Sequence, residues 1–423
     1  MRDPAVRMLW HRGFLFAVML AAACVLVPTA CRRADTPAEK ERVIIVGVDG
    51  LHTPLMHELV GAGKLPNFKS IIEQGAAGTM STWETKLPPL STRIWTSVAT
   101  GVLPKEHGIF SFFTTDSDGS RRMLTGAHRK SAAMWQIASR AGMRVGVVNW
   151  WFTYPVEELD GFIISDRYIE SWARRSAKFW NAEHEWSPDS VVYPPELDTA
   201  LRSIEEVPSA LGPDPESAEK KDGYIFDLSY KALETQPAVD LLLIYTRGMD
   251  ELSHMQWHTH EPLPGEKPTR DLVVDYMIRF DGILGRLLER LTPSDTLMVL
   301  SDHGFERSTK SVSVAGPPTT GEHQTKESAY GLFLMMGPRI KKGESVGVVS
   351  VLDILPTTLE LLDIPAAENM PGKVFRKAYI DPEFETLPRV ATYERGAVGV
   401  EASERSKEEE ERIDHLRALG YLD

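Results

Sequence analysis

The chain has 423 residues, with 47 Lys and Arg against 60 Asp and Glu, which gives a formal net charge of −13. Hydrophobic residues make up 42% and charged residues 25%, which is typical of a globular protein and excludes global disorder. The acidic balance excludes a nucleic-acid polymer as the main partner, because binding to a phosphate backbone requires a basic face. A small anionic substrate is compatible with it, since bound metal ions supply local positive charge.

Residues 1–31 have the layout of a secretory signal. Three arginines precede an apolar run, 14–27, that is shorter than the ~20 residues a membrane-spanning helix needs. Small residues precede Cys31 as at a bacterial lipoprotein cleavage site, which predicts lipidation of Cys31, with Cys24 as the alternative. A plain cleaved signal and an uncleaved anchor are the other interpretations of this segment.

The rest of the chain divides by composition. Residues 32–42 are polar and are predicted to be a short tether. Residues 43–400 are predicted to be the catalytic domain, and the charged segment 401–423 is predicted to be a helix that docks on it. Together with the signal segment, this organisation predicts an exported protein in the periplasm or at the cell surface of a bacterium, anchored to the membrane by a lipid.

Apolar, β-branched runs predict strands that are buried on both faces, as in a parallel sheet. Between several of these runs lie helical patterns, of which 271–291 is the clearest. Strands that alternate with helices predict an α/β fold with a doubly wound, mostly parallel sheet flanked by helices. The predicted strands are 43–48, 144–148, 241–245, 296–300 and 332–336.

The stretch 152–236 has a different character. It is rich in Trp, Glu, Ser and Pro, and within it only residues 161–164 have the pattern of a buried strand. We predict an insertion over the edge of the sheet that acts as a cap and selects the substrate.

Metal-ligand residue types follow the predicted strands. In open α/β sheets, ligands bind beyond the carboxyl ends of the strands. Asp49 follows the first strand, and Asp302 with His303 follows the fourth. An Asp in such a place is often a helix cap, but two adjacent ionisable residues after a buried strand are costly to bury without a partner. The pattern therefore indicates a metal site rather than isolated caps.

Three further side chains complete this set. Asp250 and His254, four residues apart, follow the third strand, and His323 lies in the loop before the fifth. Either histidine alone could equally be an interior residue with a hydrogen-bond partner. Imidazole and carboxylate ligands together suit Zn²⁺, with manganese or iron as alternatives. With about three protein ligands for each ion, these six side chains predict two divalent metal ions.

The segment 88–101 predicts a turn and a short helix with Ser91 at or near the N-cap. A helix N-terminus presents free amides and the positive end of a dipole, which favours a phosphate oxygen. A hydroxyl there is usually only a cap, but metal coordination lowers its pKa and makes it a nucleophile. Thr92 is the alternative nucleophile, and Arg93 is a candidate for binding the substrate phosphate or a structural arginine.

These motifs resemble the type I phosphodiesterase/nucleotide pyrophosphatase branch of the alkaline phosphatase superfamily, and most closely its predicted phosphohydrolase/phosphomutase group. The similarity runs from about residue 43 to the C-terminus, with the motifs in the order of the family. It implies an alkaline phosphatase-like fold. The matching motifs are VDG at 48–50, PPLST, TSVATG and HGI between 88 and 109, Asp250 with His254, SDHG at 301–304, His323, 353–358 and LGYL at 419–422.

The resemblance also implies a reaction and a division of the ligands. Ser91 would attack the phosphorus of a phosphate mono- or diester in line with the leaving oxygen, and water would hydrolyse the phosphoserine intermediate. The ligand sets would be Asp250, His254 and His323 for one ion, and Asp49, Asp302 and His303 with the Ser91 hydroxyl for the other.

Other functions on this fold are distinguished by particular residues. Nucleotide pyrophosphatases carry an Asn shortly after the HGI motif, and 110–113 (FSFF) stand here instead, which disfavours a nucleotide diester as substrate. A sulfatase requires C/S-x-P-x-R, and 91–95 lack that pattern. A phosphomutase or a phosphoryl or phosphoethanolamine-type transferase would share the ligands and is the main alternative. A catalytically dead, lipid-anchored binding protein is disfavoured by the complete ligand set.

Overall fold

The computed structural model describes residues 41–82, 89–115, 121–169, 191–204, 214–262, 264–265, 267–308, 320–323, 325 and 328–394. They belong to one compact unit, Glu41–Asp423. The predicted signal segment with Cys24 and Cys31 lies outside the described residues, as does the predicted C-terminal helix 401–423. Among the helices that the structure describes, none combines the length and the hydropathy needed to cross a membrane.

A nine-stranded sheet lies at the centre of this unit, in the order β13-β2-β12-β9-β1-β8-β5-β6-β7. The pairings of β12 and β7 with their neighbours are antiparallel, and all other neighbours in the sheet pair in parallel. The strands are β1 Val43–Val48, β2 Ala76–Ser81, β5 Val145–Val148, β6 Gly161–Ile164, β7 Val192–Tyr193, β8 Leu241–Thr246, β9 Thr296–Leu300, β12 Tyr330–Met336 and β13 Glu344–Ser350.

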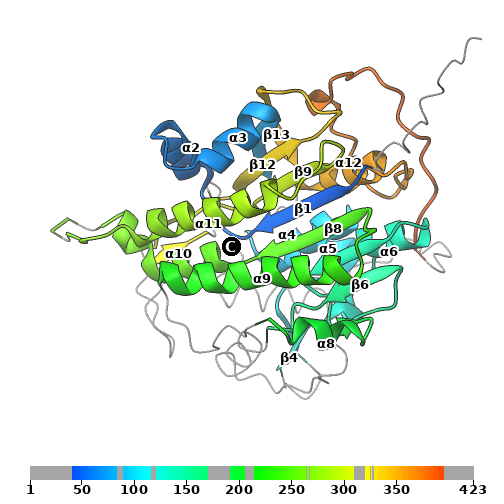
Figure 1. Cartoon of the computed structure of the whole chain (residues 1–423), viewed down its shortest axis with the longest axis horizontal. Helices are drawn as coiled ribbons and strands as arrows, with labels where there is room; N and C mark the ends of the chain where they lie inside the picture. Colours follow the sequence, from blue (N-terminus) through cyan, green and yellow to red (C-terminus); the bar gives the residue numbers. More distant parts are fainter. Residues whose placement is uncertain are drawn as a thin grey trace, which may run out of the picture. The chain divides into compact units, whose positions relative to one another are not determined.

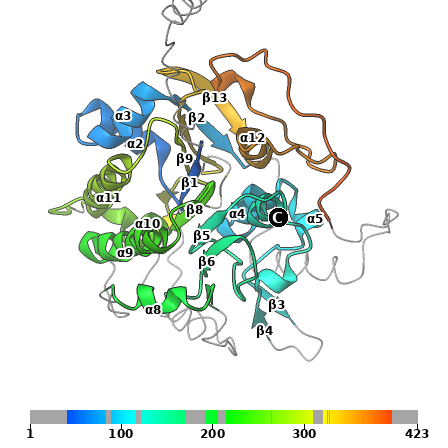
Figure 2. The ribbon, with the colours of Figure 1, turned by 45° about the vertical axis from the view of Figure 1, so that its right-hand side comes forward.

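Helices cover both faces of the sheet (Figure 1; Figure 2). Successive residues of β1 enter different cores: Val43 and Ile45 pack in one hydrophobic cluster, and Ile44 and Val46 in the other. This alternation explains why the run has no polar positions. The first cluster contains residues of α4 (Ser91–Thr100), α6 (Met134–Arg140) and α12 (Ile354–Leu361), and the second contains residues of α2 (Thr53–Gly61), α3 (Pro66–Gln74), α8 (Leu197–Leu201), α9 (Pro215–Thr235), α10 (Gly248–His260) and α11 (Leu272–Leu288).

Shorter elements connect these layers. They are the helix α5 (Pro104–His107), the 3₁₀ turns η3 (Gly126–His128), η5 (Val351–Asp353) and η6 (Arg376–Ala378), and the antiparallel pairs β3 (Phe113–Thr115) with β4 (Arg121–Met123) and β10 (Glu306–Arg307) with β11 (Gly321–Glu322). The β10–β11 pair is extended by a backbone hydrogen bond from Ser308 to Thr320 at 2.9 Å.

The predicted α/β fold with a mostly parallel sheet is confirmed. Each of the five predicted runs is a strand of the sheet, and β1 and β9 have the predicted bounds. The predicted helix 271–291 is α11, which Asp271 caps by accepting a hydrogen bond from the Val274 backbone at 3.0 Å. β12 differs from the predicted parallel pattern because it runs antiparallel to β9. The described residues between these strands form no crossover helix, which a parallel pairing would require.

The predicted insertion, 152–236, contributes regular structure to the main body. β6 pairs in parallel with β5, and β7 pairs with β6 at the edge of the sheet. α9 buries Ile225, Phe226 and Leu228 in the second hydrophobic cluster. Residues 170–190 and 205–213 of this segment lie outside the described residues, and its role as a cap that selects the substrate stays a prediction.

Candidate metal and phosphate site

Three neighbouring strands, β9, β1 and β8, end at one edge of the sheet and are followed by the predicted ligands. Asp49 follows β1, Asp302 and His303 follow β9, and Asp250 lies in the first turn of α10 after β8. Because these strands are parallel neighbours, residues far apart in the chain converge where the strands end. Asp49, Asp302 and His303 are at most 1% exposed to solvent.

The turn after β1 holds the first carboxylate in place. Gly50 has φ of +69°, a conformation that strains residues with a side chain. A Cβ atom at Gly50 would also lie 2.7 Å from the ring of Phe305 and 3.0 Å from the Cα of Asp250. The Gly50 N–H donates to Asp302 Oδ1 at 3.2 Å. The Asp49-Gly50 pair therefore ties the β1 turn to the loops that follow β8 and β9.

Ser91 is the first residue of α4, directly after the N-cap residue Leu90. Its hydroxyl donates to Asp49 Oδ1 at 3.1 Å and lies 3.5 Å from His303 Nε2. The Oγ1 of Thr92, the alternative nucleophile, is buried and has no hydrogen-bond partner among the described residues. The structure therefore brings Ser91, and not Thr92, into hydrogen-bond contact with the ligand set.

The second predicted ligand set also lies together. His254 Nε2 is 3.4 Å from Asp250 Oδ1 and 3.2 Å from His323 Nε2. His323, which follows β11, has its Nε2 3.8 Å from Asp250 Oδ1. Both histidines approach Asp250 through the same nitrogen, Nε2, so their ligand atoms face one small volume.

The two sets adjoin at His303. Its Nε2 is 3.2 Å from Asp49 Oδ1, 3.4 Å from Asp302 Oδ2 and 3.7 Å from Asp250 Oδ1. Its ring stacks on that of His323, with centroids 3.8 Å apart and planes at 13°. Two groups have all their ligand atoms within 4.8 Å of one another: Asp49, Asp302 and His303 in one, and Asp250, His303 and His323 in the other. His303 belongs to both groups, whereas the family resemblance implied His254 in the second.

Backbone carbonyls orient two of the imidazoles. His303 Nδ1 lies 3.1 Å from the carbonyl oxygen of Gly304, and His254 Nδ1 lies 3.1 Å from that of Gly321. A carbonyl only accepts, so each Nδ1 carries the proton. In the neutral ring this leaves the lone pair on Nε2, which is the nitrogen that faces the carboxylates. Metal-binding histidines are oriented in the same way.

The electrostatics of the site are strongly perturbed. Burial and the charge of Asp49 raise the pKa of Asp302 well above its ordinary value. Burial also opposes ionisation of Asp49, but the hydrogen bond and charge of His303 outweigh it and lower the pKa of Asp49. Burial lowers the pKa of His303, but the charges of Asp302 and Asp49 outweigh it and raise that pKa to about 10. Burial and the neighbouring histidines lower the pKa of His323 well below its ordinary value. Without a bound cation, protonation is therefore favoured at Asp302 and His303, and ionisation is favoured at Asp49.

Two carboxylate oxygens in the site indicate what is needed to complete it. Asp250 Oδ1 and Asp302 Oδ2 are buried and have no hydrogen-bond partner among the described residues. Imidazole nitrogens lie 3.4 to 3.8 Å from these oxygens, and a divalent cation among these groups would satisfy both oxygens without a proton. Mixed imidazole and carboxylate ligands suit Zn²⁺, Mn²⁺ or iron. The residues that are present therefore fit divalent metal ions.

Two residues beside the site were not predicted from the sequence. Tyr245, the penultimate residue of β8, donates its hydroxyl proton to Asp49 Oδ2, and the Trp151 indole N–H donates to the Tyr245 oxygen at 2.6 Å. The only sequence signal for Tyr245 is a phenol at the end of an otherwise apolar run, because a buried hydroxyl requires a partner. Phe112, in the segment 110–113 that follows the HGI motif, packs edge-on against Trp151 with ring centroids 5.4 Å apart.

Other motif residues support α4. His107 of the HGI motif accepts a hydrogen bond at Nδ1 from the Ile109 backbone at 3.1 Å, so its Nε2 carries the proton and donates to Ser97 Oγ at 3.1 Å. Burial lowers the pKa of His107 to about 3, so the ring is neutral. Arg93 is 1% exposed, two residues after Ser91, and its predicted contact with the substrate phosphate stays a prediction.

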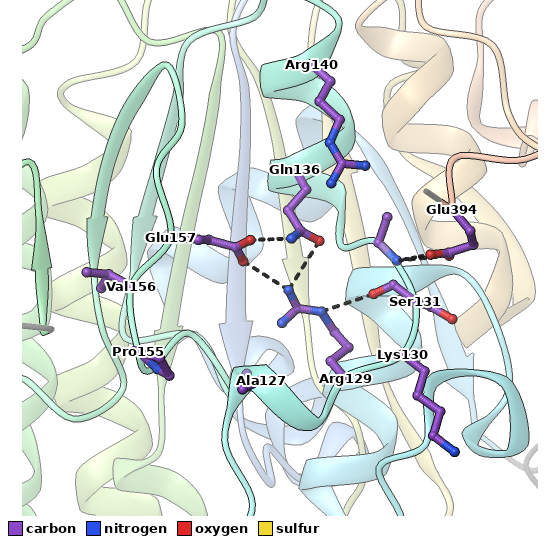
Figure 3. Close-up of a pocket in the computed structure, with 12 residues that line it drawn as sticks. Ala127, Arg129, Lys130, Ser131, Gln136, Arg140, Pro155, Val156, Glu157 and Glu394 are labelled. Carbon is purple, nitrogen blue, oxygen red and sulfur yellow. Dashed lines mark hydrogen bonds and ion pairs between the residues drawn. The ribbon is translucent and has the colours of Figure 1, made fainter. Parts of the chain in front are cut away.

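A cavity of about 450 Å³ lies apart from these ligands, between α6 and the residues after η3 (Figure 3). Several of its charged residues have hydrogen-bond partners within the protein. Arg129 donates to Glu157 at 3.0 Å, and the Glu394 carboxylate accepts from the Ala132 backbone at 2.9 Å. None of the predicted site residues lines this cavity.

Parts of the chain are similar to known proteins. Residues 43–350, which include every predicted ligand and Ser91, match the model of one family, Type I phosphodiesterase / nucleotide pyrophosphatase. The chain is similar to Arylsulfatase K of Gallus gallus, with 30% identity over 115 residues that make up 26% of this chain and only 20% of that protein. It is also similar to phosphonoacetate hydrolase from Sinorhizobium meliloti 1021, solved in complex with phosphonoformate, with 20% identity and a TM-score of 0.44 over 66% of this chain and 59% of that one.

Proposed function

The chain belongs to the type I phosphodiesterase / nucleotide pyrophosphatase family, and on this premise we propose that it is an exported hydrolase of phosphate esters that holds two divalent metal ions and uses Ser91 as its nucleophile. The observation that carries the proposal is the hydrogen bond of 3.1 Å from the Ser91 hydroxyl to Asp49, beside six carboxylate and imidazole side chains that lie close together. No other hydroxyl among the predicted nucleophiles has such a contact in the described part of the chain.

We divide the ligands between the ions as the family resemblance implies. Asp49, Asp302 and His303 would hold one ion beside Ser91, and Asp250, His254 and His323 would hold the other. When bound, the ions lower the pKa of the serine hydroxyl and neutralise charge on the phosphate. Zn²⁺ is the preferred metal, because imidazole nitrogens make up half of the ligand set.

The serine performs the covalent step. Ser91 Oγ forms a bond to phosphorus while the bond from phosphorus to the ester oxygen breaks, and the leaving oxygen takes a proton from water. The hydroxyl proton passes toward Asp49 Oδ1, which already accepts it at 3.1 Å. The amino end of α4, on which Ser91 is the first residue, stabilises the negative phosphate oxygens. Water then hydrolyses the phosphoserine, which releases phosphate or its monoester and restores the serine.

The substrate is a small phosphate mono- or diester. Residues 110–113, which follow the HGI motif, contain no Asn, and Phe112 among them packs against Trp151; this favours esters other than nucleotide diesters. Hydrolysis of p-nitrophenyl phosphate, bis-p-nitrophenyl phosphate and phenylphosphonate by the metal-reconstituted protein ranks the classes. Release of inorganic phosphate into water, rather than transfer to an added alcohol, distinguishes a hydrolase from a phosphomutase or a transferase with the same ligands.

The nucleophile is tested with a matched pair of variants. Ser91→Ala is expected to lower kcat by about three orders of magnitude or more. A peptide phosphorylated at Ser91 is expected when the wild-type reaction is quenched with acid, and no corresponding phosphopeptide is expected in the variant. Thr92→Val changes the adjacent buried hydroxyl, which has no partner to lose, and is expected to retain most of the activity. Wild-type turnover by Ser91→Ala would end the proposal.

The export and anchoring part of the proposal has its own test. It is supported by the sequence of residues 1–31, which lie outside the described residues. Labelled palmitate is expected to be incorporated by the wild type and by Cys24→Ala, but not by Cys31→Ala. Incorporation by the wild type and by Cys31→Ala, but not by Cys24→Ala, would assign the lipid to Cys24. No incorporation by any of the three proteins would exclude a lipoprotein.

A further inference from the structure

A chain of hydrogen bonds leads to Asp49 from the loop after β5, and the proposed covalent step does not use it. Tyr245 donates to Asp49 Oδ2, and the Trp151 indole donates to the Tyr245 oxygen at 2.6 Å. The three side chains are at most 4% exposed. Solvent therefore does not compete for these hydrogen bonds.

Trp151 and Asp49, the first and last groups in this series of hydrogen bonds, fix the direction in which each bond is donated. An indole N–H only donates, and an ionised carboxylate only accepts. Because Trp151 supplies the proton that the Tyr245 oxygen accepts, the phenol's own proton is the one directed to Asp49 Oδ2. The other carboxylate oxygen, Oδ1, accepts from Ser91 at 3.1 Å and lies 3.2 Å from His303 Nε2. The two oxygens of Asp49 thus have separate roles, one toward the phenol and one toward the site.

The loop that delivers Trp151 has a strained backbone. Asn149 and Phe152, at either end of it, have φ of +59° and +61°. Left-handed backbone at such residues persists only where the surroundings enforce it, and it concentrates at functional sites. Asn149 Nδ2 also donates to the backbone oxygen of Tyr245 at 2.9 Å. One loop therefore fixes both the backbone and the hydroxyl of Tyr245.

Packing alone does not explain these hydrogen bonds. Trp95 and Trp150 lie against the Tyr245 ring, with centroids 5.1 and 5.9 Å away. These contacts are made by the ring, and a phenylalanine at this position would make them equally. The hydroxyl is needed only for the bonds to Asp49 and Trp151.

We propose that Tyr245 and Trp151 are positioning residues that orient Asp49, so that it presents a single carboxylate oxygen to the metal ion and to Ser91. Partners of this kind, one bond removed from a metal, tune ligand orientation and basicity. The inference rests on the proposed function, because it requires Asp49 to be a metal ligand.

Metal affinity tests the proposal directly. In a competition between the protein and a chromophoric chelator for Zn²⁺, the wild type is expected to show two dissociation constants. Tyr245→Phe is expected to weaken one of them by about 10- to 100-fold and to leave the other unchanged, because Asp250, His254 and His323 do not contact the phenol. Trp151→Phe removes only the indole donor and is expected to weaken the same constant by a smaller factor.

Trp135→Phe is the matched control. Trp135 is fully buried in α6, and its indole N–H donates to Glu157 at 2.8 Å, away from the ligands. This variant is expected to lower thermal stability as much as Trp151→Phe does while both dissociation constants stay at their wild-type values. Equal weakening of both constants in Tyr245→Phe, or of neither, would overturn the positioning role.

The same experiment separates this inference from the function on which it rests. A wild type that binds no Zn²⁺ refutes the proposed function itself. A wild type that binds two ions, together with a Tyr245→Phe protein that binds both as tightly, refutes only the positioning role. Where Tyr245→Phe does not fold, Trp151→Phe decides, since its ring keeps the contact with Phe112 and only the donor is lost.

Discussion

Asp302→Asn is expected to stabilise the metal-free protein while it abolishes metal-dependent activity. Asp302 is 0% exposed, its Oδ2 has no hydrogen-bond partner among the described residues, and its pKa is raised well above the ordinary value by burial and by Asp49. The variant keeps an oxygen that can accept the hydrogen bond of 3.2 Å from Gly50 and removes the ionisable group. In the metal-free wild type, by contrast, the buried ionisable carboxyl group of Asp302 lowers the free energy of unfolding.

The magnitude follows from proton linkage. A carboxyl group whose pKa is raised on folding destabilises the folded protein by about 1.4 kcal/mol for each pH unit that separates its folded-state and unfolded-state pKa values, once the pH exceeds both. The charge of an ionised Asp302 also helps to raise the pKa of His303, and this favourable pairing reduces the destabilisation. We expect Asp302→Asn to be more stable by about 1–3 kcal/mol at pH 7, a rise in Tm of roughly 1–4 °C for a chain of this size.

The difference in stability between Asp302→Asn and the wild type is expected to depend on pH and on Zn²⁺, which makes the prediction specific. The folded-state pKa of Asp302 is raised, so its penalty is absent below the unfolded-state pKa and grows as the pH rises through it. The advantage of the variant is therefore expected at pH 7 and lost by about pH 4. Excess Zn²⁺ should stabilise the wild type by about 4 kcal/mol at a thousand times its Kd and the variant by far less.

Differential scanning fluorimetry with chelator and with Zn²⁺, at pH 4, 5.5 and 7, measures all three effects. Asp281→Asn is the control, because both oxygens of this buried carboxylate accept backbone hydrogen bonds from Asn67, and Oδ1 also accepts one from Phe68 at 2.8 Å. It should destabilise the protein with or without metal. An Asp302→Asn protein that is less stable than the wild type in chelator, or whose advantage does not change with pH, would refute the reasoning.

Two further predictions concern residues that support the site. Gly248→Ala should lower both metal affinity and Tm. The new Cβ would lie 2.4 Å from the Tyr276 hydroxyl and 2.6 Å from Asp222 Oδ2 and would displace the start of α10, which carries Asp250. A Zn²⁺ titration and a melting curve test this prediction, and wild-type affinity would contradict it. His107→Gln should make stability less sensitive to acid. The pKa of His107 is lowered to about 3 in the folded state, so the free energy of unfolding of the wild type falls by up to ~1.4 kcal/mol per pH unit below about pH 6.5. Chemical denaturation at pH 4.5 and 7 measures this effect, and identical pH profiles for the two proteins would contradict the prediction.

The strands and the convergence of the candidate ligand residues could be predicted because their signals are local. β1 and β9 are uninterrupted apolar runs, and each is followed directly by an ionisable residue, Asp49 or Asp302. Parallel strands that end at one edge bring such residues together whatever the details of the connections. Ser91 was also indicated locally, by the turn and helix start in its segment.

What could not be predicted depends on contacts between distant segments. The bond from Tyr245 to Asp49 joins residues 196 positions apart, and the bond from Trp151 to Tyr245 joins residues 94 apart. The place of α9 in the main body was missed because its segment has few apolar residues, although Asp214 and Pro215 give it a recognisable N-cap and first turn. The position of His303 between both ligand groups follows from the order of the strands, which no single run encodes.

The β10–β11 pair has a consequence for how the chain can vary. Ser308 bonds to Thr320 at 2.9 Å, Arg307 pairs with Gly321, and the Thr320 N–H donates to the backbone oxygen of His254 at 2.7 Å. These bonds fasten the chain on both sides of residues 309–319 immediately before it reaches His323. These bonds set the position of the chain on its approach to the histidine, so we expect changes in the length of 309–319 to leave His323 in place, and a protein engineer could graft a peptide there.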